Sequence, residues 1–343
     1  MKAIRLTGHG GNEVVSLCDC ASPVRKPTEV VVAMKASTLN QVDLYMRNSG
    51  AGITHQLPQT MGIEGCGVVL DSDPQSPCQP GQRVVLYPGI TCGECEFCQR
   101  GDEVLCTKMS LLGEHRDGTW ADQVAVPQRN VLPAPEHLSD EEAAALGVTH
   151  LTAWRMLRTQ AKLQSGEWVL ILGIGGGVSL AGLQLAKAMG ARCIVTSRHA
   201  HKLEQAKAHG ADHTIDTSTV HLVDEVMRIT SGRGVDVVFE NVGAAVWSQA
   251  MKCLVRSGRL VTCGATTGDQ PPADLRRIFI RQLQILGSTL GNRKEMADFL
   301  SFVSQHRIRP HIDRIYSRDQ VHEALSCMSQ GEQFGKLALR LDR

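Results

Sequence analysis

The feature that most constrains the fold is residues 168–198, where two apolar runs enclose a cluster of glycines and an amphipathic segment. The first run, Trp168–Leu172, has the length of a buried strand, and apolar or small residues recur with helical spacing from Val178 to Met189. A second run follows at Cys193–Thr196. Strand, glycine turn, helix and strand make a βαβ unit, whose helix N-terminus can bind a pyrophosphate. The turn residues expected to lie against such a ligand are Gly173, Gly175, Gly176, Gly177 and Val178.

The glycine pattern departs from a strict Gly-x-Gly-x-x-Gly, because Val178 stands where the last glycine belongs. Glycines alone would also fit a tight turn in another kind of α/β protein. The strand before them and the helix after them favour a dinucleotide-binding turn. From Gly166 onward, strand and helix patterns alternate as far as Gln284–Gly287. This alternation predicts an α/β fold with a doubly wound parallel sheet of six strands.

The residues before this stretch have a different pattern. Short apolar runs alternate with Gly, Pro and charged residues over residues 1–133, which predicts a compact β-rich domain. A helical stretch beginning at Asp140 links it to the next region, and a chain of 343 residues exceeds what one hydrophobic core usually supports. The predicted parts are a β-rich domain over 1–150, a nucleotide-binding domain over 151–290, and a C-terminal segment, 291–343, that returns to the first domain.

Charge and hydropathy exclude several classes of partner. The formal net charge is +1, with acidic and basic residues mixed along the chain, so neither nucleic acid nor a membrane surface is an expected partner. No segment approaches the roughly 20 apolar residues of a membrane-spanning helix, and Met1–Arg5 does not lead into a signal-peptide apolar region. We therefore expect a cytoplasmic protein that acts on a small molecule.

Four of the twelve cysteines lie within fifteen residues. In a large protein of a reducing compartment, such a cluster indicates a metal site rather than disulfides. Four thiolates can bind one zinc ion and leave no coordination position open, so the site is structural. An iron–sulfur cluster is the alternative that this spacing leaves open. The predicted zinc ligands are Cys92, Cys95, Cys98 and Cys106, in a lobe over about residues 90–110.

Several motifs occur together in one order along the chain. They are Gly62-x-Glu64-Gly65-x-Gly67-x-Val69, Gly81-x-Arg83-Val84, the cysteine lobe, the glycine turn, Val235-Asp236-Val237-Val238 and Gly258-Arg259-Leu260-Val261. With these motifs the whole chain resembles the medium-chain dehydrogenase/reductase superfamily. The resemblance implies a GroES-like β-rich catalytic domain joined to a Rossmann domain. It also implies a homodimer or homotetramer, in which the strand that ends at Gly287 pairs across subunits.

The resemblance also shows what this chain lacks. Zinc alcohol dehydrogenases of the superfamily bind a second, catalytic zinc through two cysteines and a histidine, and here Asn40 and Ile63 stand at the first two of these positions. The region of the third, near Thr149, contains no cysteine, and Val42 replaces the proton-relay hydroxyl. The chain therefore resembles the zinc-independent quinone oxidoreductases and enoyl reductases, whose Asn-x-x-Asp pattern corresponds to Asn40 and Asp43. Those proteins usually lack the cysteine lobe as well. A metal site rebuilt near Glu64 from Cys66 and His150 remains the alternative.

The cofactor prediction rests on the end of the second strand. NAD sites usually place an acidic residue there, whereas this sequence has Ser197, Arg198 and then Lys202. A hydroxyl and a guanidinium can bind a 2′-phosphate that a carboxylate would repel, so NADPH is predicted over NADH. The alternative for Arg198 and Lys202 is an ordinary solvated helix start. By resemblance, further cofactor contacts are expected from Asn241, Gly264, Ala265, Thr266 and Ser288, and from Lys336 toward the phosphates.

Without a Lewis acid, a reductase must stabilise the developing enolate or quinol oxygen with hydrogen-bond donors. The candidate catalytic residues are Asn40, Tyr45, His115 and Thr149, with Arg116 as a further polar neighbour. The predicted activity is hydride transfer from NADPH to a quinone or an α,β-unsaturated carbonyl. The alternatives are an alcohol or aldehyde dehydrogenase of the same superfamily and an NADPH-binding sensor or scaffold without turnover.

Overall fold

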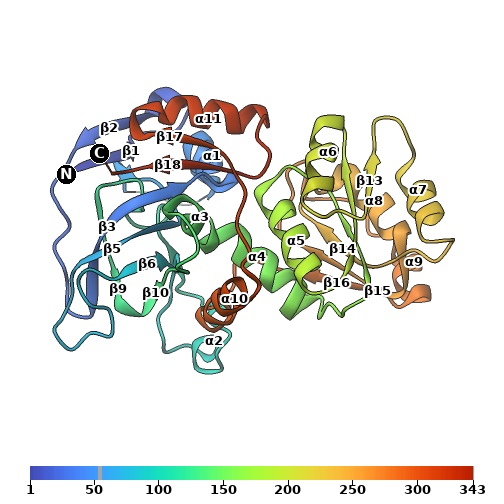
Figure 1. The fold of residues 1–343 in the computed structure, drawn as a ribbon, viewed down its shortest axis with the longest axis horizontal. Coiled ribbons are helices and arrows are strands. Elements are labelled where there is room, and N and C mark those ends of the chain that lie inside the picture. Colours follow the sequence, from blue (N-terminus) through green and yellow to red (C-terminus); the bar gives the residue numbers. More distant parts are fainter. Residues whose placement is uncertain (53–55, 343) are drawn as a thin grey trace. The chain divides into compact units, whose positions relative to one another are not determined.

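The computed structural model describes residues 1–52 and 56–342, which form two compact units (Figure 1). The first unit comprises Met1–Leu151 and Gly291–Arg343, and the second is the continuous stretch Thr152–Leu290. The chain therefore leaves the first unit once and returns to it once. Among the described residues, no helix is both long enough and apolar enough to cross a membrane.

The first unit is built around a sheet of seven strands, with smaller sheets of three and two strands beside it. Its strands are β1 (Lys2–Leu6), β2 (Val15–Asp19), β3 (Glu29–Thr38), β4 (Gln59–Thr60), β5 (Gly65–Asp71), β6 (Arg83–Leu86), β7 (Gly89–Ile90), β8 (Ser110–Leu111), β9 (Gln123–Pro127), β10 (Val131–Pro133), β17 (Ile312–Ser317) and β18 (Lys336–Arg340). Its helices are α1 (Gln41–Ser49), α2 (Glu96–Gln99), α3 (Asp140–Ala144), α10 (Arg293–His306) and α11 (Val321–Gln330).

The end of the chain completes this sheet. The strand order is β10-β6-β5-β3-β18-β17, and β9 also pairs with β3. Strand β18 lies antiparallel to β3, with Ala338 opposite Thr38, and its side chains are buried except at Arg340. The last strand is therefore an interior strand of a sheet whose other members, apart from β17, come from the first 133 residues.

The second unit is a six-stranded parallel sheet with helices between its strands. Its strands are β11 (Trp168–Ile171), β12 (Arg192–Ser197), β13 (His213–Asp216), β14 (Val235–Glu240), β15 (Leu254–Thr262) and β16 (Gln284–Gly287). Its helices are α5 (Gly177–Ala188), α6 (Ala200–Ala208), α7 (Leu222–Ile229), α8 (Ala244–Cys253) and α9 (Leu275–Arg281). The order is β13-β12-β11-β14-β15-β16. All six residues of β14 are buried, as expected for a strand covered on both faces. The predicted fold class is confirmed.

The helical stretch predicted from Asp140 is interrupted. Ser139 caps α3, since its Oγ accepts a hydrogen bond from Glu142 N at 3.2 Å. After Ala144 the chain changes to a π-helical turn, Leu146–His150, and then to α4 (Leu151–Trp154) and a second π-helical segment, Arg155–Gln160. Within the first turn, Val148 N donates to Glu64 Oε2 at 2.6 Å. A side chain from another part of the chain thus takes a backbone donor out of the helical ladder, and such π-turns often mark functional sites.

Candidate active site and metal centre

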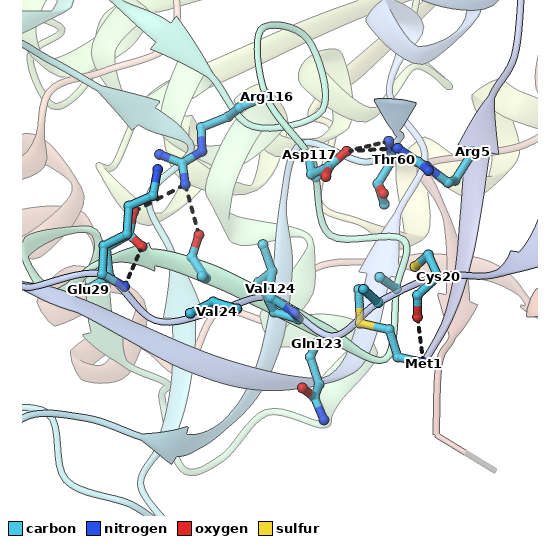
Figure 2. Close-up of a pocket in the computed structure, with 16 residues that line it drawn as sticks. Met1, Arg5, Cys20, Val24, Glu29, Thr60, Arg116, Asp117, Gln123 and Val124 are labelled. Atoms are coloured by element: carbon cyan, nitrogen blue, oxygen red, sulfur yellow. Dashed lines mark hydrogen bonds and ion pairs between the residues drawn. The ribbon is translucent and has the colours of Figure 1, made fainter. Parts of the chain in front are cut away.

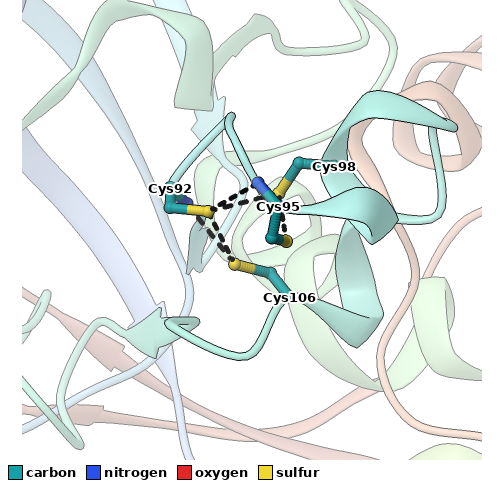
Figure 3. A group of neighbouring side chains, drawn as sticks. All are labelled: Cys92, Cys95, Cys98 and Cys106. Atoms are coloured by element: carbon teal, nitrogen blue, oxygen red, sulfur yellow. Dashed lines mark hydrogen bonds between the residues drawn. The ribbon is translucent and has the colours of Figure 1, made fainter.

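The four clustered cysteines converge on one point in the first unit (Figure 3). Their Sγ atoms lie within 4.8 Å of one another, although the residues are spread over a loop, α2 and the turn after it. Backbone N–H groups of Glu94 and Cys95 donate to Cys92 Sγ and lower the pKa of that thiol to about 6. Four thiols within reach of one ion, with thiolate stabilised by the backbone, fit tetrahedral zinc. The donor set supports the predicted structural zinc.

The cysteine lobe is tied to the start of α10. The Glu103 carboxylate accepts hydrogen bonds from Arg293 N and Nε at 2.8 Å each, and from an Arg293 terminal guanidinium nitrogen at 2.6 Å. The side chain of Asn292 donates to Gly101 O at 3.0 Å. The segment by which the chain re-enters the first unit at Gly291 is therefore held by residues lying between the third and fourth cysteines.

A second polar centre of the first unit surrounds Glu64, whose exposed fraction is 0%. Its Oε1 accepts hydrogen bonds from Thr38 Oγ1 and from Asn40 Nδ2, the latter at 2.9 Å. Its Oε2 accepts the Val148 N–H described above. A buried carboxylate is tolerated only when such donors compensate for lost hydration. The donors come from the end of β3, the start of α1 and the π-helical turn.

The cation that balances Glu64 is Lys336, the first residue of β18, which is 3% exposed. Its Nζ donates to Leu39 O at 2.7 Å, Asn40 Oδ1 at 2.8 Å and Glu64 Oε1 at 3.0 Å. These contacts use all three ammonium donors. They also fix the Asn40 amide on both sides, because its oxygen accepts from Lys336 and its nitrogen donates to Glu64. The predicted contact of Lys336 with cofactor phosphates remains a prediction, and in this arrangement its donors are already engaged within the first unit.

Two further buried acids lie in the same unit. Burial raises the pKa of Asp43 to about 7, against the lowering effect of the hydrogen bond that its Oδ2 accepts from Asn40 N at 2.7 Å. That bond caps α1, as expected for a residue with a structural role. Burial also raises the pKa of Glu114 to about 7. The negative charges of Glu64 and Glu114 add to the rise at Asp43.

The raised pKa of Glu114 predicts a pH-dependent stability. Its carboxyl retains its proton in the folded state up to about pH 7 but loses it near pH 4.5 when unfolded, so stability falls as pH rises through that window. The contribution of Glu114 to the free energy of unfolding should decrease by on the order of 3 kcal/mol across it. Urea unfolding of Glu114→Gln at pH 4.5–7.5 should show a flatter profile than the native chain. Glu136→Gln, at an exposed position, should keep the native slope; equal slopes in all three proteins would contradict the assignment.

The other predicted catalytic residues differ in what they can offer a substrate. Tyr45 lies on α1 with 40% of its surface exposed. His115 is exposed, and its Nδ1 lies 3.2 Å from Leu111 N, an arrangement in which Nδ1 accepts and Nε2 carries the proton. Thr149 is buried in the π-helical turn, and its Oγ1 donates to Ala145 O at 3.4 Å. Tyr45 and His115 are therefore the two of these three residues that are exposed.

In the second unit, the predicted cofactor residues share one edge of the parallel sheet. They follow the carboxyl ends of β11, β12, β14, β15 and β16, with Gly173, Ser197, Asn241, Gly264 and Ser288 at or just beyond the strand ends. From β11, the chain first adds strands on one side (β12, β13) and then on the other (β14, β15, β16), so the switch point lies between β11 and β14. Ligands bind at such a switch point in open α/β sheets. Helix α5 begins there, with Gly176 as its N-cap.

The glycine turn after β11 leaves little room for side chains. Gly175 has φ +119°, and a Cβ added there would lie 2.7 Å from Lys202 Cδ and 3.3 Å from Lys202 Nζ. The stem of Lys202 thus covers the turn, and its ammonium lies close to the helix N-terminus, where a phosphate is favoured. Arg198 is exposed, whereas Ser197 is buried and its Oγ accepts from His199 N at 3.1 Å. Ser288 Oγ is buried without a hydrogen-bond partner among the described residues, and its contact with the cofactor remains a prediction.

Sequence reasoning missed three residues that shape this edge. Ser179, in the first turn of α5, donates to Leu172 O at 2.9 Å and accepts from Asn241 Nδ2 at 3.0 Å. The buried carboxylate of Glu240 accepts from Val242 N and Gly243 N at 2.6 Å each, and so shapes the turn that carries Asn241. Gly182 packs against Phe239, whose ring would lie 2.9 Å from an added Cβ. Of these three residues, only Gly182 could have been noticed in the sequence. A glycine in this helix allows close helix–strand packing, which is the usual role of the last glycine in the motif.

Comparison with known proteins agrees with this geometry. Residues 26–136 match the family described as the alcohol dehydrogenase GroES-like domain, and residues 177–305 match the zinc-binding dehydrogenase family. A solved structure of an NAD-dependent alcohol dehydrogenase is 37% identical, with full coverage of both chains and a TM-score of 0.96. The chain belongs to the medium-chain dehydrogenase/reductase superfamily.

Two further members show the range of named activities among its relatives. An NAD-dependent alcohol dehydrogenase of Sulfurisphaera tokodaii is 29% identical over 350 residues and aligns with 99% of each chain. A crotonyl-CoA carboxylase/reductase structure is 25% identical, with a TM-score of 0.92, and aligns with 99% of this chain and 88% of that one. As a medium-chain dehydrogenase/reductase, the chain is an oxidoreductase that uses a nicotinamide cofactor, and its cysteine lobe is a structural zinc site.

The residues at the expected catalytic-zinc positions do not fit a metal. Asn40 has its amide engaged on both sides, Ile63 offers only a buried alkyl group, and the hydroxyl of Thr149 donates to a backbone carbonyl. Zinc prefers thiolate and imidazole ligands. Within the part of the chain that the structure describes, the four lobe cysteines are the one group of three or more His, Cys, Asp or Glu side chains close enough to share an ion. A site rebuilt from Glu64, Cys66 and His150 is therefore not assembled.

Proposed function

We propose that this superfamily member is an NADPH-dependent reductase of quinones or α,β-unsaturated carbonyl compounds that works without a catalytic zinc. When bound, the reduced nicotinamide supplies a hydride to an electrophilic carbon of the substrate. The chain must then stabilise the oxygen that gains negative charge, and a proton must reach that oxygen or the adjacent carbon. A relative named as a crotonyl-CoA reductase supports this class of reaction.

The observation that carries the proposal is the cluster of Lys336, Asn40 and Glu64. Where a catalytic zinc would need thiolate and imidazole ligands, these side chains form a closed, charge-balanced network. Such a network is rigid because every member has partners from different parts of the chain. Its role in the proposed reaction is to position α1 and the π-helical turn, while substrate is bound by other groups.

Proton donation is assigned to the two candidates whose side chains are exposed. Tyr45 presents a phenolic O–H from α1, and His115 presents Nε2–H from the turn after the cysteine lobe. Either can donate to a developing enolate or quinolate oxygen, which is the requirement in the absence of a Lewis acid. Tyr45→Phe removes the phenolic O–H, and His115→Gln replaces the imidazole with an amide that cannot transfer a proton, so the variant with the larger loss of kcat identifies the proton donor.

The choice of NADPH rests on Ser197 and Arg198, and relatives named as NAD-dependent make it the part of the proposal that most needs a test. Arg198→Ala should weaken NADPH binding by about 10- to 100-fold, since one charge-assisted bidentate contact is lost, and should leave NADH binding nearly unchanged. Fluorescence titration of both cofactors measures this. Lys207→Ala, at the far end of α6, is the matched control. Equal losses for the two cofactors in Arg198→Ala would refute the assignment.

An alcohol or aldehyde dehydrogenase is the second candidate, because the relatives at 29–37% identity carry that name. A panel of quinones, enones, aldehydes and alcohols with both cofactors distinguishes the two. Turnover of quinones or enones supports the proposal, turnover of alcohols and aldehydes alone supports the second candidate, and NADPH binding without turnover supports a sensor.

Metal analysis adds a separate criterion: one zinc per chain is expected, and two tightly bound zinc ions would contradict a metal-free reaction centre.

We also propose that the chain assembles through the edge strand β16 as a homodimer, or as a homotetramer made of two such dimers. This strand pairs on one side only, with β15, and an unpaired strand edge favours association. Exposed apolar side chains lie on α9, the helix that precedes β16 in the chain, where Leu275 and Phe279 are each 68% exposed. Light scattering should give at least twice the chain mass. Phe279→Lys should lower that mass, whereas a monomeric native protein would contradict the proposal.

A further inference from the structure

A cavity of about 600 Å³ lies in the first unit, apart from both the cysteine lobe and the Glu64 network (Figure 2). It is bounded by the extended segment that joins β2 to β3, by strand β9 and by the turn that contains Arg116 and Asp117. Its volume is in the range of sites that hold small molecules. None of the residues assigned to zinc, cofactor or proton transfer lines this cavity.

One cation among the charged groups that line the cavity is only weakly balanced by acidic side chains. Arg116 donates to Glu29 Oε1 at 3.3 Å and to Ala125 O at 3.1 Å, and Asp117 accepts from Thr60 N at 2.8 Å. The Arg5 guanidinium, by contrast, has one hydrogen bond among the described residues, to Pro58 O, and its nearest carboxylate oxygen, on Asp117, is 3.9 Å away.

The guanidinium of Arg5 also contains an unsatisfied donor. Its Nε is buried without a partner among the described residues. The Arg5 side chain as a whole is 23% exposed, so the terminal guanidinium nitrogens are the donors that an acceptor on a ligand would meet. Lys26 adds a second positive charge to the lining. The charge balance of the cavity thus favours an anion.

Much of the remaining lining is apolar, although Thr60 and Gln123 also belong to it. Val24 and Val124 both line the cavity (Figure 2), as do Pro23, Ala121 and Ala125. Val24 is 84% exposed, which is unusual for a large apolar side chain beside a cavity. A ligand that covers it would remove apolar surface from water.

We propose that this cavity binds a short-chain aliphatic carboxylate, with the carboxylate on the Arg5 guanidinium and the alkyl chain against Val24 and Val124. A planar guanidinium can bind a carboxylate through two parallel hydrogen bonds, here from its two terminal nitrogens. The site is independent of the proposed reductase reaction, because no residue of that reaction lines it.

The test is calorimetric titration of the whole protein with hexanoate, 1-hexanol and inorganic phosphate. Hexanoate should bind saturably at one site per chain. Arg5→Gln should weaken hexanoate binding at least tenfold. Arg25→Gln is the control and should leave binding unchanged, because Arg25 lies on the segment between β2 and β3 but is bonded to Asp71 and does not line the cavity. Any binding of 1-hexanol should be the same in the native protein and in Arg5→Gln. Binding of phosphate as tightly as hexanoate would overturn the assignment to a carboxylate.

A second pair of variants keeps the proposal testable if Arg5→Gln affects folding. Val24 is exposed, so Val24→Asp and Val24→Asn should both fold normally. The aspartate variant should weaken hexanoate binding several-fold more than the asparagine variant, because it adds a like charge to the wall of the cavity. No saturable binding to the native protein, or binding that neither Arg5→Gln nor Val24→Asp weakens, would overturn the proposal.

Discussion

Replacing Lys336 with methionine should lower the free energy of unfolding by about 3–5 kcal/mol, the range measured when one partner of a buried ion pair is removed. Methionine retains most of the volume of the lysine stem but removes the ammonium that balances Glu64. The carboxylate would keep its donors from Thr38, Asn40 and Val148 but would be left as an uncompensated buried charge. Urea unfolding, followed by far-ultraviolet circular dichroism, measures the loss.

Two controls separate the charge effect from packing. The double variant Glu64→Gln with Lys336→Met removes both charges and should recover most of the lost stability. Lys294→Met breaks an exposed ion pair with Asp298 on α10 and should cost about 0.5 kcal/mol or less. If Lys336→Met cost no more than Lys294→Met, the pair would have no net role in stability.

Replacing Cys106 with serine should reduce bound zinc from one ion per chain to almost none and destabilise the chain by on the order of 4–5 kcal/mol, since loss of a structural metal is one of the few single changes with so large an effect. The effect should extend beyond the lobe, because Glu103 and Gly101 hold Arg293 and Asn292 at the start of α10. Hydrogen exchange of the backbone N–H of Arg293, which donates to Glu103, should therefore accelerate in the variant.

Cys18→Ser is the matched control for this experiment. Cys18 lies on β2, outside the lobe, and its thiol makes one weak contact with Ala3 O at 3.6 Å. This variant should retain one zinc and native exchange at Arg293. Full zinc content in Cys106→Ser would show that the cysteine does not ligate the metal. Zinc loss without faster exchange at Arg293 would show that the lobe and α10 are not coupled.

The parts of the molecule with local signals could be predicted from sequence. Strands β11, β12 and β14 are rich in apolar residues because both faces of a parallel strand are buried, and the glycines between β11 and α5 mark the turn. The cysteine spacing identified the zinc ligands for the same reason, since four donors within fifteen residues need no knowledge of the tertiary fold.

The Glu64 centre could not be predicted, because it depends on contacts between distant residues. Lys336 lies 272 residues from Glu64 in sequence, and a lysine at the start of a short strand carries no local sign of burial. The break after Ala144 has the same origin, since Glu64 takes the Val148 donor from an otherwise helical segment. The resemblance placed Asn40 at the former metal position, but only the packed structure shows that both ends of its amide are engaged.

The position of β18 has a consequence for how this chain folds as it is synthesised. The second unit is continuous, so it can fold as soon as residue 290 has emerged, whereas the first unit remains without an interior strand and with an unbalanced Glu64 until Lys336 is available. At about 5–20 residues per second, the first 151 residues wait roughly ten seconds or more for the strand that completes them. During this interval the end of β3 that pairs with β18, Ala36–Thr38, is an edge to which another nascent chain can add. The unit translated first is therefore the one that finishes last and most depends on protection from aggregation.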